Sequence, residues 1–343
     1  MSADATAPPA DPAQHVLQLS SGYIVSTAMY LAAKLEIADH LAAGRSTIGE
    51  LARATGANEG ALYRVLRLLA SLGVFDETGP RSFALTPVGT LLRKGVPGSL
   101  HGIAVFLPDP LHFRVYANAI DSVLTGKPAL ESTVGMPGFE YLRRNPEYSE
   151  VFNQAMTTLS ATVVPATLEA YDFSGIKVLV DIAGGHGELL TSILQKYPTM
   201  RGILTEVDHV VAGAIPRIAD LGLADRCEAV AADLFKTAPA GADAYMLKNI
   251  IHDWDDEHCE QILRTIHTAM GSKRGKVLLL EMMIPAGREP SLGKIIDIEM
   301  LLWPGGLERT ANEFRALFDH AGFDLTAIIP TKSPVTIVEA LKR

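Results

Sequence analysis

The sequence predicts an α/β protein whose C-terminal half forms an open, doubly wound, mainly parallel sheet, preceded by a mainly helical domain. Two observations predict this class. After residue 171, short runs of branched apolar residues alternate with segments of helical period, as expected for strands covered by helices on both faces. Before residue 100, apolar residues recur mostly at helical spacing. With 343 residues, the chain is long enough for two domains.

The composition indicates a packed globular protein that works on a small molecule. Apolar residues make up 48% of the chain, and a net charge of −9 opposes electrostatic binding to nucleic acid or anionic membranes. Only Cys227 and Cys259 are present, which gives neither a disulfide framework nor a zinc pattern and favours a reducing compartment. No apolar run reaches the ~18 residues of a spanning helix. We therefore expect a cytoplasmic protein with no nucleic-acid or membrane partner.

The N-terminal part predicts a flexible tail followed by a winged helix. Residues 1–14 have neither the basic flank nor the apolar stretch of a signal peptide. From residue 15 to 40 the segment is so apolar that we expect a second subunit to bury part of it. Ser46 or Thr47 then opens a helix that ends at Gly56, Asn58 opens another, and two short extended pieces follow. This winged helix, within residues 15–100, is expected to be a scaffold because its second helix is mostly apolar.

Residues 101–170 are expected to form a helical linker that contributes to a substrate pocket. Phe152 and Met156 lie one helical turn apart in this linker. A pair with this spacing is suited either to core packing or to the wall of a pocket between domains.

From residue 171 to 343 the rhythm of strand, helix and strand indicates the sheet. Helices are expected over 188–196, 255–270 and 312–320. The last two strands are separated only by "PTKSP", which is too short for a helical crossover, so this pair is expected to be antiparallel. The seven predicted strands are 177–183, 202–207, 227–232, 243–249, 276–283, 323–329 and 336–341.

The turn after the first strand of this sheet is the expected ligand anchor. Gly184, Gly185 and Gly187 allow a ligand to approach the backbone closely, and Asp181 at the strand's end can accept a hydrogen bond from a cationic amine. A dinucleotide fingerprint would need a third glycine where Leu190 stands, so that interpretation fails.

Two further acids favour a nucleoside ligand. Glu206 ends the second strand about 20 residues after the glycines, where an acid can bind both hydroxyls of a ribose. Asp233 follows the third strand and is placed to accept the exocyclic amine of an adenine. Three acids without a basic phosphate clamp suit a cationic nucleoside, and S-adenosylmethionine has this character.

Across residues 15–343 the chain resembles the class I, S-adenosylmethionine-dependent O-methyltransferases of the caffeate and hydroxyindole type. The motifs that carry the resemblance are "LVDIAGGHGELL", "DLF", "MLKNIIHDWDDEHCEQIL", "LLLEMMIP" and "GGLERTANEFRALFDHAGF". The resemblance implies an N-terminal dimerisation domain of winged-helix type, a homodimer and a Rossmann-like catalytic domain.

By position, the resemblance also assigns residues to the cofactor. Ala183 replaces the first glycine of the family's loop, and Glu206 replaces its usual aspartate; both changes remain compatible with cofactor binding. The residues that fall on the family's cofactor contacts are Gly184, Glu206, Asp233, Leu234 and Lys248.

The resemblance places the catalytic base at His252, with Glu281 and Glu308 as its orienting carboxylates. His252 follows the fourth strand at the edge where the cofactor is expected. A hydroxyl that attacks a sulfonium methyl must lose its proton, and an imidazole with a pKa near ~6.5 is suited to take it. A carboxylate on the other ring nitrogen fixes the tautomer and favours the imidazolium that develops.

A metal site is the alternative interpretation of the acids and histidines at residues 252–258. His252 and His258 are six positions apart and would lie on different helix faces, whereas the run "DDE" at residues 255–257 suits a helix N-terminus. We therefore expect no metal.

A small aromatic compound with a hydroxyl group is the expected methyl acceptor, because aromatic and thioether side chains suit a flat ring. Two alternatives remain: a relative of the same fold diverted to hydroxylation or decarboxylation, and a ligand-sensing winged-helix regulator. The residues expected to contact the acceptor are Phe152, Met156, Asn249, Met300 and Trp303.

Overall fold

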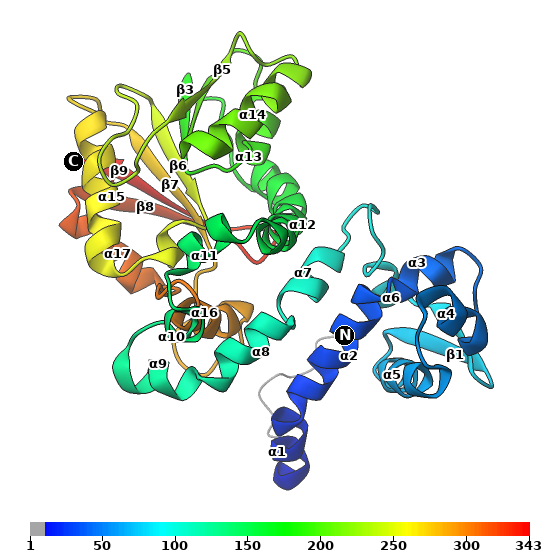
Figure 1. Cartoon of the computed structure of the whole chain (residues 1–343). Coiled ribbons are helices and arrows are strands. Elements are labelled where there is room, and N and C mark those ends of the chain that lie inside the picture. Colours follow the sequence, from blue (N-terminus) through cyan, green and yellow to red (C-terminus); the bar gives the residue numbers. More distant parts are fainter. Residues whose placement is uncertain (1–10) are drawn as a thin grey trace. The chain divides into compact units, whose positions relative to one another are not determined.

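The computed structural model describes residues 11–343 and divides the chain into two compact units (Figure 1). The first unit contains residues 11–117 and 140–161, and the second contains residues 118–139 and 162–343. The segment 101–170 is helical, as expected for the linker, but its residues are shared between the two units. Two of its helices include residues of both units, namely α11 (Gly138–Arg144) and α12 (Pro146–Ala170).

The first unit is built from helices and one hairpin. The side chain of Thr47 caps α4 in a capping box with Glu50, Gly56 ends α4 at φ 71°, and Asn58 caps α5, which confirms these predicted helix ends. The other elements are α1 (Pro12–Ser20), α2 (Gly22–Lys34), α3 (Ile37–Ala42), α4 (Ile48–Thr55), α5 (Glu59–Ser71), β1 (Phe75–Gly79), β2 (Ser82–Leu85), α6 (Pro87–Thr90), α7 (His101–Phe106) and α8 (Pro110–Ala117).

The start of the first unit differs from the expected tail. Helix α1 begins at Pro12, because Asp11 accepts a hydrogen bond from the backbone of Ala13 and proline suits the first helical position. Residues 1–10 of the expected tail lie outside the described residues. Within residues 11–343 no single helix is long and apolar enough to cross a membrane, although α1 and α2 pass that test together across a 42° bend.

The second unit contains a seven-stranded sheet in the order β5-β4-β3-β6-β7-β9-β8. Strand β9 pairs antiparallel with both β7 and β8, and the pairs among β3 to β7 are parallel. This confirms the predicted doubly wound sheet with an antiparallel last strand. The strands are β3 (Val178–Ile182), β4 (Arg201–Glu206), β5 (Cys227–Ala231), β6 (Ala244–Lys248), β7 (Lys276–Glu281), β8 (Phe323–Pro330) and β9 (Thr336–Lys342).

Helices cover both faces of this sheet (Figure 1). Leucines of α13 and small apolar residues of α14 pack on one face, and Ile262 of α15 and Phe314 of α17 pack on the other. The helices of the second unit are α9 (Ala119–Thr125), α10 (Ala129–Val134), α13 (Glu188–Lys196), α14 (Asp208–Asp220), the short 3-10 helix η1 (Ile251–Asp253), α15 (Asp256–Ala269), α16 (Leu292–Leu302) and α17 (Ala311–His320).

The strand order brings the predicted site residues to one edge of the sheet. Strands β5, β4, β3, β6 and β7 are neighbours and run in the same direction, so their carboxyl ends lie side by side. Each of them ends at or just before a predicted site residue. This edge, at the point where the strand order reverses, is where ligands bind in such sheets.

Candidate active site

The turn between β3 and α13 requires its glycines. Gly185 and Gly187 have φ of 60° and 77°, in the left-handed region that glycine adopts without strain. Gly184 is required for lack of space, since a Cβ there would lie 2.3 Å from Oδ2 of Asp181. Ala183 is also left-handed at φ 53°, which costs about 1–2 kcal/mol for a residue with a Cβ.

Asp181 presents a buried carboxylate with unused acceptor capacity. The side chain is 1% exposed, and its Oδ1 has no hydrogen-bond partner among the described residues. Burial raises the pKa of this carboxyl to about 7; nearby Lys248 opposes the shift and Glu206 adds to it. A buried oxygen without a donor carries a desolvation cost, and a cationic amine donor would relieve it.

Glu206 and Asp233 follow the next two strands. One carboxylate oxygen of Glu206 accepts the backbone amide of Gly185 at 3.1 Å, so this acid is fixed against the glycine turn. Asp233 accepts the amide of Phe235 at 3.0 Å and pairs with Lys236 at 2.7 Å. The hydrogen bond from Lys236 lowers the pKa of the Asp233 carboxyl, which is therefore ionised at neutral pH. Leu234 packs against the apolar layer that contains α15.

Lys248 is the last residue of β6, and Asn249 follows it, three positions before His252. Burial lowers the pKa of the Lys248 ammonium, while the charges of Asp181 and Glu281 oppose this shift. Asn249 is left-handed at φ 53°, and its buried Oδ1 has no hydrogen-bond partner within residues 11–343. Asparagine tolerates this backbone conformation better than most residues, so the chain turns sharply here toward η1.

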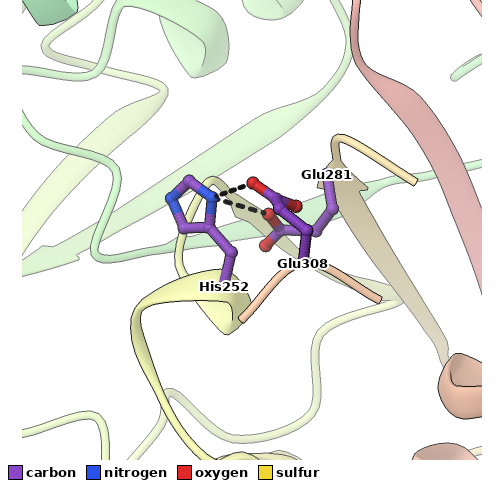
Figure 2. A group of neighbouring side chains, drawn as sticks. All are labelled: His252, Glu281 and Glu308. Atoms are coloured by element: carbon purple, nitrogen blue, oxygen red, sulfur yellow. Dashed lines mark hydrogen bonds and ion pairs between the residues drawn. The ribbon is translucent and has the colours of Figure 1, made fainter. Parts of the chain in front are cut away.

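His252 lies in η1 and is held by carboxylates (Figure 2). Its Nδ1 is 2.8 Å from Oε1 of Glu308 and 3.8 Å from Oε2 of Glu281. Glu281 is the last residue of β7, and its other oxygen accepts the backbone amides of Ile250 and Ile251. The three side chains come from separate segments and lie close together, whereas their roles as base and orienting acids stay a prediction.

The charges of this group shift the pKa values of its members. Burial disfavours the imidazolium of His252, but the charges of Glu281 and Asp253 and the hydrogen bond to Glu308 outweigh it and raise the pKa. Burial also raises the pKa of the Glu281 carboxyl, against the opposing charge of His252. Because an imidazole bonded to a carboxylate through Nδ1 keeps a proton on that nitrogen, Nε2 is the atom available to accept another.

Two residues of this site were missed by sequence reasoning. Oδ1 of Asp253 lies 3.6 Å from Nε2 of His252, yet the sequence placed this acid only in the alternative metal cluster. Arg309 is buried and donates to the carbonyl oxygen of Ile251 in η1 and to that of Trp254 directly after it. The position of an acid directly after the histidine was the only signal for Asp253, whereas a buried arginine has no sequence signature.

The alternative metal interpretation is tested by the same distances. Asp255 caps α15 and pairs with Nδ1 of His258 at 2.7 Å, so these residues form the predicted helix N-terminus. Ligand atoms of His252, Glu281 and Glu308 lie within 4.8 Å of one another, close enough to share a cation. The 2.8 Å contact between His252 and Glu308 has the length of a charge-assisted hydrogen bond and needs no ion to explain it.

The residues expected to contact the acceptor fall in different units. Met300 and Trp303 lie at the end of α16, whose Asp297 accepts the backbone amide of Glu308 at 2.9 Å. Phe152 and Met156 belong to the first unit, where Phe152 packs edge-on against Phe106. Their assignment to the acceptor stays a prediction, as does that of Asn249.

The chain matches known O-methyltransferase families and proteins. An O-methyltransferase domain family matches residues 116–324, and an O-methyltransferase dimerisation domain matches residues 17–95. The phenazine O-methyltransferase PhzM of Lysobacter antibioticus is 43% identical over 325 residues, which cover 95% of each chain.

Solved structures of methyltransferases are also similar to this chain. The crystal structure of LaPhzM has a TM-score of 0.89 at 42% identity and covers 97% of this chain and 100% of its own. The O-methyltransferase NcsB1, in complex with S-adenosyl-L-homocysteine and 1,4-dihydroxy-2-naphthoic acid, has a TM-score of 0.80 at 31% identity and covers 98% of this chain and 100% of its own. The chain therefore belongs to the family of O-methyltransferases that use S-adenosylmethionine as the methyl donor.

Proposed function

We propose that this enzyme transfers the methyl group to a hydroxyl of a small aromatic compound, with His252 as the general base. The observation that carries the proposal is the bond from Nδ1 of His252 to Glu308, which leaves Nε2 as the proton acceptor. Glu281 and Glu308 then act as orienting groups that stabilise the imidazolium formed during the reaction.

The residues at the sheet edge fit the cofactor. The unpartnered Oδ1 of Asp181 suits the cationic amine of its methionine part, and Gly185, where a Cβ would meet nothing within 4 Å, leaves room beside the backbone. We assign the ribose to Glu206 and the adenine amine to Asp233, with Leu234 and Lys248 as further contacts. When bound, S-adenosylmethionine supplies a methyl group on a positively charged sulfur.

The side chains of the site take up and release one proton. Nε2 of His252 would take the proton of the acceptor hydroxyl. The hydroxyl oxygen would at the same time bond the methyl carbon, which leaves the sulfur of the cofactor. The ring is then an imidazolium, which Glu308 holds at 2.8 Å through Nδ1. Solvent takes the proton afterwards, and no covalent bond to the protein is needed. General-base catalysis of this kind contributes about 10²- to 10⁴-fold.

An aromatic acceptor is supported by the relatives. One is named for phenazine, and another was crystallised with a dihydroxynaphthoic acid; both compounds contain fused aromatic rings. In this chain Trp303 is 92% buried and Met300 is half-buried at the end of α16. We propose that these two side chains and Asn249 contact the acceptor.

Replacement of His252 tests the mechanism. We expect His252→Ala to lower kcat by about 10²- to 10⁴-fold, because no other imidazole within residues 11–343 is bonded to Glu308. Binding of S-adenosylmethionine, measured by calorimetry, is expected to change less than twofold. His258→Ala is the matched control, since this histidine of the same motif is exposed and its Nδ1 pairs with the helix cap Asp255. A wild-type turnover rate in His252→Ala would rule out the proposed base.

A further inference from the structure

The segment Gly305–Arg309 lies directly against η1, which carries His252. A Cβ at Gly306 would lie 1.9 Å from the carbonyl oxygen of His252 and 2.4 Å from the carbonyl carbon of Asp253. Glycine is therefore required at 306 for this approach. Two residues later, Glu308 bonds the imidazole. One short segment thus contacts both the backbone and the side chain of the base.

The buried side chain of Arg309 bonds the backbone around η1. Its guanidinium is 1% exposed, and Nη1 donates to the carbonyl oxygen of Ile251 at 3.0 Å. Nη2 donates to the carbonyl oxygen of Trp254 at 2.9 Å and to Oδ1 of Asp256 at 2.7 Å, and Nε donates to the same oxygen at 3.0 Å. These carbonyls precede and follow the pair His252–Asp253, so the guanidinium spans the turn.

The backbone amides and the backbone carbonyls around η1 are bonded by different charged residues. Glu281 accepts the amides of Ile250 and Ile251 at 3.1 and 2.9 Å, and Arg309 donates to the carbonyls of Ile251 and Trp254. A 3-10 turn of three residues has poor internal hydrogen bonds, so these external bonds determine where it lies. Both charged residues belong to chain segments remote from η1 in sequence.

A buried guanidinium is a costly way to fill this space. Removing an ion from water costs several kcal/mol, and a packed apolar side chain is often at least as stable. The acid partner Asp256 is 70% exposed in its side chain, and exposed ion pairs return little stability. The rigid fork of five donors, which an apolar residue lacks, instead fixes several oxygens in a defined geometry.

We propose that Arg309 is a positioning residue that sets where the imidazole of His252 lies relative to Glu308 and to the reacting methyl group. This inference rests on the proposed role of His252. In this role Arg309 touches neither cofactor nor acceptor and acts only through η1.

Arg309→Lys tests the proposal, because lysine keeps the charge but has no fork to bond Ile251, Trp254 and Asp256 together. We expect kcat to fall by about 10²-fold, the loss that a misplacement of about 1 Å produces. The KM for S-adenosylmethionine is expected to stay within twofold. In the His252→Ala background the same change is expected to have no further effect on the residual rate. Equal losses in both backgrounds would overturn the proposal.

A milder pair of variants covers the case in which Arg309→Lys does not fold. Asp256→Ala removes the carboxylate that fixes the guanidinium and is expected to lower kcat several-fold, whereas Asp256→Asn keeps an oxygen acceptor and should restore most of it. Glu257→Ala is the matched control, because it removes an acid from the same first helical turn. Equal kcat values in Asp256→Ala and Glu257→Ala would count against positioning by Arg309.

A spectroscopic measurement separates this inference from the proposed function. The Nδ1 proton shared by His252 and Glu308 is expected to give a low-field NMR resonance that shifts in Arg309→Lys and Asp256→Ala and stays in place in Glu257→Ala. An unshifted resonance in the first two variants would refute positioning by Arg309. An active His252→Ala enzyme would instead refute the general base.

Discussion

The imidazole of His252 faces more negative charge than a single proton neutralises. Glu308 bonds Nδ1, Glu281 lies 3.8 Å from the same atom, and Asp253 lies 3.6 Å from Nε2. Burial lowers the pKa of His252, but these carboxylates outweigh it and raise the pKa above its ordinary value. Burial in turn raises the pKa of Asp253 to about 6, against the opposing charge of His252. A bound sulfonium adds positive charge nearby and favours loss of the ring proton, which readies the base.

The raised pKa of His252 predicts a pH dependence. The base must be neutral to accept a proton, so kcat/KM for the acceptor is expected to rise with pH, with an apparent pKa above ~6.5. Glu308→Gln removes one negative charge and should lower that apparent pKa by about one unit or more, along with kcat. Initial rates at saturating cofactor between pH 5 and 10 measure both. An apparent pKa that is identical in the variant would contradict the role of Glu308.

The raised pKa of His252 affects the stability of the fold in the opposite direction to the activity. A histidine whose pKa is raised by folding stabilises the folded state fully below its unfolded pKa, and this contribution is lost as pH rises through the folded pKa. Activity is therefore gained over the pH range in which this stabilisation is lost. Thermal unfolding of wild type and His252→Ala over the same range shows whether the two trends share one group.

At the scale of elements, the sheet and its helices could be predicted because their sequence signals are local. Helix α13 has the predicted bounds, Asp255 caps α15, and the short link before β9 forces an antiparallel strand. The family resemblance predicts His252, Glu281 and Glu308 as the base and its orienting acids, and the fold brings these three side chains together. Arg309 could not be predicted, because the sequence shows a charged residue in a polar stretch and only the fold buries it.

The turn between β3 and α13 yields a prediction at this scale. Gly184→Ala would place a Cβ 2.3 Å from the Asp181 carboxylate and 2.7 Å from Leu204. We expect a loss of about 1–3 kcal/mol in the free energy of unfolding and weaker binding of S-adenosylmethionine. Gly175→Ala is the control, because a Cβ there meets nothing within 4 Å. Urea denaturation and calorimetry measure the two effects, and normal cofactor binding by Gly184→Ala would show that this turn is not the anchor.

At the scale of the whole molecule, the first helix has no buried residue of its own. Val16, Leu17 and Leu19 of α1 are 62%, 70% and 67% exposed, and Tyr23 of α2 is 63% exposed. An isolated helix of nine residues is not stable in water, and contiguous exposed apolar side chains mark an interaction surface. The sequence analysis expected a second subunit for this segment, and the dimerisation domain that matches residues 17–95 supports a homodimer.

We therefore expect the enzyme to sediment at about twice its chain mass of 36.8 kDa, and the double variant Leu17→Glu, Leu19→Glu to sediment mostly as a monomer. Two buried charges at an apolar interface would each cost several kcal/mol, which would weaken the dimer. Ile215→Glu on α14 is the control, since Ile215 is 53% exposed but lies in the catalytic unit. A double variant that remains dimeric would place the interface elsewhere, because charged side chains on α1 are tolerated only where water reaches them.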